Sequence, residues 1–192
     1  MQTARRNRND EIIQTVYATG TGALTTTLSN TAVADLGNGQ VRLAIAADIY
    51  DAPSLVYIEG TTNYDGLRKI AAAPAGFIDI YASYLAETPA GTETVKIAYA
   101  PDSAVEIKAL TLKLSAVPAG AENLTISIDD GLGATYDVQI HQVDLNGVTA
   151  AGYIWTPTDK LIAHLGDVIR LVWANGDGRT YGLKLHTEKI QA

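Results

Sequence analysis

Apolar and polar residues alternate along several short segments of this chain, the pattern of a β-strand with one buried face. The alternation is clear over residues 124–129, 136–141 and 181–186, and it recurs over 41–47. No segment sustains the 3.6-residue period of an amphipathic helix beyond a short stretch at residues 10–17. We therefore predict an all-β protein.

Short sequences that favour tight turns separate these segments. They are Asn38-Gly39, Asp65-Gly66, Asp130-Gly131, Asn146-Gly147 and the run Asn175-Gly176-Asp177-Gly178. Asparagine, aspartate and glycine adopt positive φ at low steric cost, as two-residue hairpin loops require. The last cluster lies between two strand patterns and is predicted to form a hairpin that joins the final two strands.

Two segments carry a more specific prediction. In residues 105–114 the apolar positions change phase between Ala109 and Leu110, which indicates a β-bulge or a strand that passes from one sheet to another. Residues 168–173 are apolar at nearly every position, which is typical of a central strand covered on both faces. Trp173 is therefore expected in the core.

The turn-forming residues at 100–103 mark the best domain boundary. We predict an extended N-terminal arm over residues 1–37, a small β-barrel or sandwich over 38–100, and a larger jelly-roll-like β-sandwich over 101–192. The arm is predicted because its segment is rich in Thr, Gly, Ala and Ser. Strands of the small domain are expected near residues 40–47, 54–60, 67–71, 76–84 and 93–99.

The charge is acidic overall, with 14 basic and 21 acidic residues and a net charge of −7. Nucleic-acid binding proteins present a basic face, so nucleic acid is not an expected partner. Arg5, Arg6 and Arg8 are concentrated at the N-terminus, where they form either a solvated end or an arm for an acidic surface. We find neither a signal-peptide pattern nor an apolar segment that spans a bilayer, and expect synthesis in a cytoplasm without a membrane partner.

The residue types argue against most catalytic and metal chemistry. Cysteine is absent and histidine occurs three times, so disulfides and a structural zinc site are not expected. Asp144-x-Asn146-Gly147 resembles part of a calcium loop but lacks the terminal bidentate Glu. Other groups weighed for metal binding or catalysis, without a supporting spacing, are Asp129, Asp130, Asp137, His141, His164, His186, Glu59, Asp79 and Glu87.

His141 and His186 fall on the polar phase of their strands and are expected to face solvent. Neither a nucleophile elbow nor a nucleotide-binding loop is present. We therefore predict a protein that is not an enzyme and that has no catalytic, cofactor-binding or metal-binding residues.

Aromatic residues are better candidates for contact with a partner. The chain has ten tyrosines, and tyrosine is enriched at protein interfaces because it combines an apolar ring with a polar tip. Trp155, next to Pro157 in a loop-like stretch, is a surface candidate that could also stack on a sugar. The predicted partner-binding residues are Arg5, Arg6, Arg8, Tyr17, Tyr64 and Trp155.

Residues 56–70, VYIEGTTNYDGLRKI, followed by FIDI at 77–80, resemble a small β domain common in virion proteins of tailed bacteriophages. In that domain a strand ending in Gly leads through an Asn-Tyr-Asn/Asp-Gly turn into the next strand. Residues 109–114, 121–126, 134–138 and 166–170 are similar to jelly-roll modules of phage structural proteins.

The resemblance implies a virion structural protein, made in the cytoplasm of a bacterial host. Our leading hypothesis is a capsid decoration or cement protein that binds the major capsid protein or other virion subunits through its N-terminal arm. The resemblance to such proteins also implies a homo-oligomer, most simply a trimer. The main alternative is a neck or tail component with a receptor-binding or glycan-binding role. A non-viral carbohydrate-binding module, a secreted β module and an enzyme domain form a third class.

Overall fold

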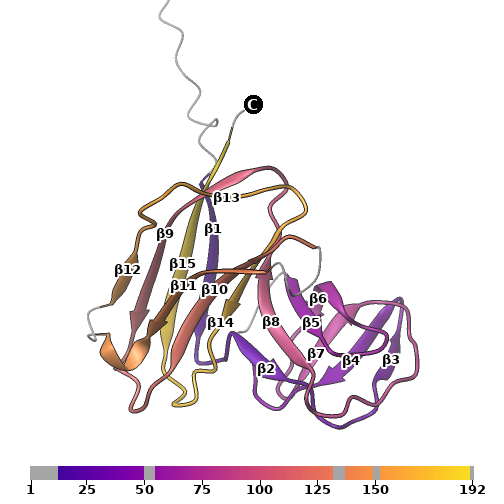
Figure 1. Cartoon of the computed structure of the whole chain (residues 1–192). Coiled ribbons are helices and arrows are strands. Elements are labelled where there is room, and N and C mark those ends of the chain that lie inside the picture. The colour runs from indigo at the N-terminus through magenta and orange to yellow at the C-terminus, as the bar shows by residue number, and fades with distance from the viewer. Residues whose placement is uncertain (1–12, 50–54, 132–136, 149–151, 191–192) are drawn as a thin grey trace, which may run out of the picture.

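The computed structural model describes residues 13–49, 55–131, 137–148 and 152–190. The fold is all-β, as predicted, and its strands form two antiparallel sheets (Figure 1). The described residues form no α-helix, and their only helical element is the short 3-10 turn η2 (Leu145–Gly147).

The smaller sheet has five strands. They are, in spatial order, β1 (Ile13–Gly20), β15 (Tyr181–Lys189), β9 (Val105–Leu114) and β12 (Tyr153–Trp155), with β13 (Leu161–Ala163) also paired to β9.

The larger sheet has ten strands. They are, in spatial order, β11 (Val138–Asp144), β10 (Asn123–Asp129), β14 (Val168–Val172), β8 (Thr94–Tyr99), β5 (Leu55–Glu59), β6 (Gly66–Ala72), β7 (Phe77–Tyr81), β4 (Gln40–Ala44) and β3 (Ala34–Gly37), with β2 (Thr25–Thr27) also paired to β8.

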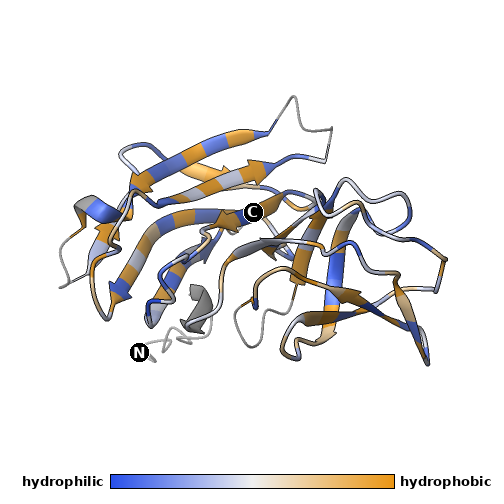
Figure 2. Ribbon diagram, turned by 90° about the horizontal axis from the view of Figure 1, so that it is seen from below, coloured by the Kyte–Doolittle hydropathy of each residue, from blue (hydrophilic) through white to orange (hydrophobic). Residues whose placement is uncertain are grey.

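The five-stranded sheet and the β11–β10–β14 part of the larger sheet form a sandwich, consistent with the predicted class. The alternating hydropathy of the strands is visible as bands in Figure 2, and the apolar positions form one buried cluster. Trp173 lies in this core, as predicted: it is fully buried, and its ring meets that of Tyr181 edge-on at 4.9 Å.

The phase change in β9 is a β-bulge, one of the two predicted alternatives. His186 pairs with Ala109 while the next residue, Thr187, pairs with Ile107, so Lys108 is an extra residue in β9. The bulge keeps Ile107 and Leu110 both buried within one sheet. The central-strand prediction for residues 168–173 is also confirmed, because β14 lies between β10 and β8 and is buried on both faces.

The predicted hairpin between the last two strands is wrong. β14 belongs to the larger sheet and β15 to the smaller one, so residues 173–180 carry the chain from one layer to the other. Asn175, with a φ of 46°, fixes this crossover: its side-chain amide donates to the carbonyls of Thr21 and Arg179 and accepts from the Arg179 N–H. Turn-forming residues specified a change of direction but not the sheet in which the next strand pairs.

The larger sheet crosses the proposed domain boundary at residues 100–103. β8 pairs with β5 on one side and with β14 on the other, so strands from residues 38–100 and 101–192 share one hydrogen-bonded sheet. The division into two domains stays a prediction. In the first half, hydrogen bonds from Ser29 N to Ala44 O and from Ala46 N to Thr27 O tie the end of β4 to the chain after β2.

The predicted N-terminal arm is wrong for residues 13–37, and residues 1–12 lie outside the described residues. β1 pairs with β15 along its whole length, from Ile13 opposite Glu188 to Gly20 opposite Tyr181. Leu24, Leu28 and Val33 are buried in the core. A segment with few large apolar residues therefore still enters the body, because each of those residues occupies a core position.

Truncation separates the two parts of this segment. Deleting residues 1–12 is expected to leave the urea midpoint nearly unchanged, whereas deleting residues 1–37 removes β1, β2, β3 and three core side chains and should abolish cooperative unfolding. The single change Leu24→Ala is expected to lower the free energy of unfolding by about 2–5 kcal/mol. A cooperatively folded 38–192 fragment with the full-length midpoint would contradict the assignment of residues 13–37 to the body.

Candidate functional site

An aromatic cluster lies where β11 and β12, edge strands of the two sheets, meet on one side of the sandwich (Figure 1). The rings of His141 and Trp155 stack at 4.3 Å with an interplanar angle of 14°. Tyr153 Oη is 2.8 Å from His141 Nε2, and the two rings are nearly parallel. These three residues form the edge aromatic cluster, which joins one sheet to the other.

His141 departs from its predicted solvent-facing position. The register between β10 and β11 shifts after Ile126, which pairs with His141, because the next residue, Ser127, pairs with Gln139. Because opposed residues share a face, this irregularity puts His141 on the face of the buried Ile126, toward β12. Val138 is 57% exposed. Burial lowers the pKa of His141, which favours the neutral ring in the stack.

Trp155 is partly exposed, in keeping with its choice as a surface candidate. Its neighbour Ile154 is 71% exposed. A partly exposed indole next to a tyrosine hydroxyl and an imidazole offers an apolar face with polar groups at its side, a combination that suits a sugar ring or a partner's side chain.

A second polar group lies around Arg170 on β14, whose side chain is only 5% exposed. The guanidinium donates hydrogen bonds to Glu59 of β5 and to Asp137, and lies 3.7 Å from Asp129 of β10. Its carbon is 5.1 Å from the centre of the Tyr57 ring. We call these five residues the Arg170 cluster.

The Arg170 cluster uses several of the carboxylates that the sequence offered for calcium or catalysis. Asp129, Asp137 and Glu59 share one buried cation, and Glu59 also accepts a hydrogen bond from Lys96 Nζ. The part of the chain that the structure describes contains no group of three or more His, Asp or Glu residues arranged to hold a metal ion. The sequence signal that could have found the cluster is an arginine inside an otherwise apolar central strand, because a buried arginine requires acidic partners.

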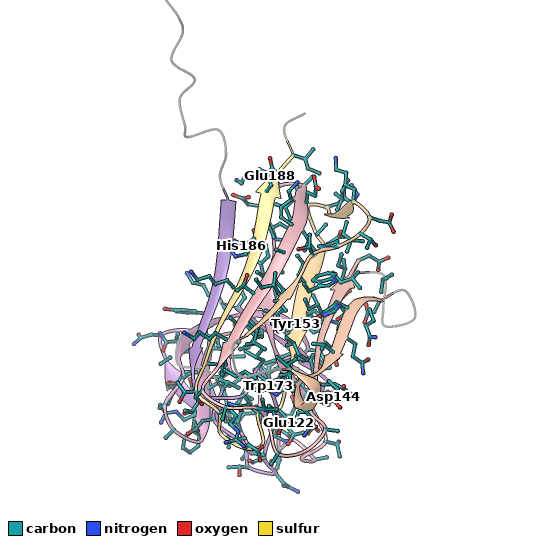
Figure 3. The ribbon with its side chains drawn as sticks, turned by 90° about the vertical axis from the view of Figure 1, so that its left-hand side faces the viewer. Glu122, Asp144, Tyr153, Trp173, His186 and Glu188 are labelled. Carbon is teal, nitrogen blue, oxygen red and sulfur yellow. The ribbon has the colours of Figure 1, made fainter. Side chains whose placement is uncertain are left out.

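Three other acidic candidates, Asp144, Glu87 and Asp79, bind backbone or basic groups within the chain. Asp144 caps η2 by accepting from Asn146 N, and it also accepts from Glu122 N, both at 3.0 Å. The Glu122 carboxylate in turn accepts from Trp173 Nε1 at 2.8 Å (Figure 3). Glu87 accepts from two backbone N–H groups, of Thr62 and Asn63, and Asp79 pairs with Arg42. Turn and cap chemistry therefore accounts for Asp144, as the sequence reasoning favoured.

The structure corrects one predicted contact residue, Tyr64. Its side chain is 1% exposed, and its hydroxyl donates to Leu85 O and accepts from Leu85 N. Tyr64 is therefore a core residue that fixes the turn after β5 against residues 82–87, and it has no surface to offer a partner. The turn is longer than the predicted tight hairpin at Asp65-Gly66: residues 60–65 connect β5 to β6, with positive φ at Gly60 and Gly66.

The other predicted contact residues are placed only in part. Tyr17 lies on β1 opposite Lys184, and its side chain lies outside the described part of the structure. Arg5, Arg6 and Arg8 also lie outside it. His164 is exposed and His186 partly exposed, and neither belongs to a metal-binding group among the described residues.

Sequence reasoning missed a group of exposed apolar side chains at the β3 end of the larger sheet. Leu36, Tyr81, Tyr84 and Leu85 are 39–53% exposed. Their two backbone segments run side by side, joined by hydrogen bonds from Ala82 N to Gly39 O and from Val33 N to Glu87 O. We call these four side chains the β3–β7 surface. Lys69 lies 5.7 Å above the Tyr81 ring at its border.

The comparisons with known proteins identify no relative. No protein-family model, no curated protein and no solved structure matches this chain. Among the residues that the structure describes, no helix is long and apolar enough to cross a membrane.

Replacing Arg170 with Met tests the Arg170 cluster. Three carboxylates would lose a buried cation, so the free energy of unfolding should fall by about 3–5 kcal/mol. The control is Lys108→Met, which removes a comparably paired but exposed cation and is expected to have a much smaller effect. Equal urea midpoints for the two variants would show that burial of the Arg170 cluster adds nothing to the stability of the fold.

Through Tyr57, the Arg170 cluster also makes the free energy of unfolding depend on pH in the alkaline range. Burial, followed by the hydrogen bond to Asp129 and its charge, raises the pKa of Tyr57 to about 12 from its ordinary 10.0. The unfolded chain therefore loses the Tyr57 proton first, so stability present below pH 10 is lost as the pH rises toward about 12. Tyr57→Phe should show a shallower loss of stability over this range in urea unfolding, and an unchanged slope would contradict the raised pKa.

Proposed function

We propose that the protein is a non-enzymatic structural subunit of a tailed-bacteriophage virion, of the capsid decoration or cement type. The observation that carries the proposal is the distribution of chemistry over the molecule. The acidic groups that could serve a reaction or a metal bind partners inside the chain, while four large apolar side chains on two hydrogen-bonded segments are exposed. Such a molecule is suited to binding other subunits.

The phage-like segment supports the same proposal. Residues 56–70 form the β5–β6 hairpin, with β5 ending before Gly60 and β6 beginning at Gly66. Tyr64 of its Asn-Tyr-Asp-Gly turn is the side chain that holds residues 82–87 in place. The segment that resembles virion proteins thus positions Leu85, one of the four members of the β3–β7 surface.

The β3–β7 surface is the proposed contact with the major capsid protein or other virion subunits. Exposed apolar patches mark interaction sites, and tyrosine provides contact area at a low cost in side-chain entropy. The arm contribution is now limited to residues 1–12, which span about 40 Å when extended. Arg5, Arg6 and Arg8 remain the proposed basic contacts of that segment, and a homo-oligomer, most simply a trimer, remains part of the proposal.

One observation favours the alternative of a neck or tail component that binds glycans. The edge aromatic cluster places the partly exposed Trp155 beside the Tyr153 hydroxyl and the His141 ring. Aromatic side chains that stack on a sugar, together with neighbouring polar groups that bind its hydroxyls, are the usual elements of such a site. The β3–β7 surface has four large apolar side chains that are 39–53% exposed, so we place subunit contact first.

Immunogold labelling of particles from the producing cells tests the proposal. An antibody raised against the purified full chain is expected to label the head shell of intact virions. Label confined to the neck or tail would support the alternative location. Particles that stay unlabelled, while the antibody detects the protein elsewhere in the same cells, would overturn the virion assignment.

A further inference from the structure

Three Asn-Gly pairs occur in the described residues, and their surroundings differ sharply. In an Asn-Gly pair the glycine nitrogen can attack the asparagine side-chain carbonyl, because glycine has no Cβ to hinder the approach. This reaction needs a side chain that is free to rotate and a glycine N–H that is not already bonded. The structure allows these two conditions to be compared at each pair.

Asn38-Gly39 meets both conditions. The two residues form the loop of the β3–β4 hairpin, closed by the pairing of Gly37 with Gln40, and both have positive φ, 54° and 71°. Both are exposed, and neither the Asn38 side chain nor the Gly39 N–H has a hydrogen-bond partner among the described residues. Ala82 N donates a hydrogen bond to the carbonyl of Gly39, which does not engage the Gly39 N–H.

Asn175-Gly176 meets neither condition. Asn175 is 5% exposed, and its side chain makes hydrogen bonds to Thr21 O, Arg179 O and Arg179 N. The Gly176 N–H donates to Glu122 Oε1 at 2.7 Å. Rotation of the amide would break several buried hydrogen bonds at once, and each donor or acceptor left buried without a partner is unfavourable.

Asn146-Gly147 lies between these extremes. Asn146 is exposed, but its side-chain amide donates to Pro118 O at 3.0 Å and its backbone N–H donates to the Asp144 carboxylate. One side-chain hydrogen bond hinders rotation less than the set of bonds around Asn175.

We propose that Asn38 is a site of spontaneous deamidation, selected by the fold from three chemically equivalent Asn-Gly pairs. The Gly39 nitrogen loses its proton and forms a bond to Asn38 Cγ while the Cγ–Nδ2 bond breaks, and the side-chain nitrogen takes up one proton and leaves as ammonia. The resulting cyclic imide adds one water and opens to aspartate or isoaspartate at position 38. The sequence involves no oxidation or reduction and needs no co-reactant other than water.

The product changes the charge of the β3–β7 surface. The Asn38-Gly39 loop follows Leu36 in the chain, and its Gly39 carbonyl accepts a hydrogen bond from Ala82 N, next to Tyr81. A carboxylate at position 38 therefore introduces a negative charge at the border of this surface. We expect an aged molecule to bind neighbouring subunits more weakly, and this expectation rests on the proposed function. The reaction itself does not, because it depends only on the hairpin.

Peptide mapping by mass spectrometry tests the proposal on the full-length chain incubated at mildly alkaline pH. Conversion at Asn38 is expected to be at least about tenfold faster than at Asn175, with Asn146 between them. In concentrated urea the three rates should converge, because the local differences come from the fold. Gly39→Ala is expected to slow conversion at position 38 only, and its far-UV circular dichroism serves as the folding control.

Two outcomes would overturn the proposal. One is an Asn38 that stays intact in the folded chain although it reacts in urea, which would mean that the hairpin protects it. The other is an equal rate at Asn38 and Asn175 in the folded chain. Immunogold labelling is independent of these rates, so the deamidation site and the virion assignment fail or succeed separately.

Discussion

The ion pairs of the buried Arg170 guanidinium connect the two halves of the larger sheet through side chains. It lies on β14 and binds a carboxylate from β5 of the first half together with carboxylates from the second half. Backbone pairing of β8 with β5 and β14 already joins these strands. The cluster adds a requirement for one relative position, because a buried cation is stable only when its acidic partners are in place.

In this arrangement the prominent acidic side chains support the fold, and other residues form the proposed contact surfaces. Carboxylates that stand out in the sequence neutralise a cation, cap η2 or bind turn N–H groups, and so support the fold. The surface features that remain are the β3–β7 surface at one end of the larger sheet and the edge aromatic cluster at the other. The two features therefore lie at opposite ends of the larger sheet, on β3 and β7 and on β11.

The sequence predicted the strands well because local patterns control them. Alternation located β4, β10 and β15, and the phase change in β9 marked its bulge. The failures arose where distant segments decide the outcome. Residues 13–37 look like an arm locally, yet β15 and β8 provide edges on which they pair. Tyr64 looks like a surface tyrosine in a polar turn, yet the backbone of Leu85 lies over it.

The all-β class, the phase change in β9, the buried central strand and the internal position of Trp173 follow from the amino-acid sequence, because periodicity and residue type are local properties of the chain. Tertiary contacts settle that the phase change is a bulge, which sheet each strand joins, which carboxylates meet Arg170, and which apolar side chains stay exposed. It also distinguished the three Asn-Gly pairs, which the sequence makes equivalent. Those outcomes depend on contacts between residues far apart in the chain, and no local pattern encodes them.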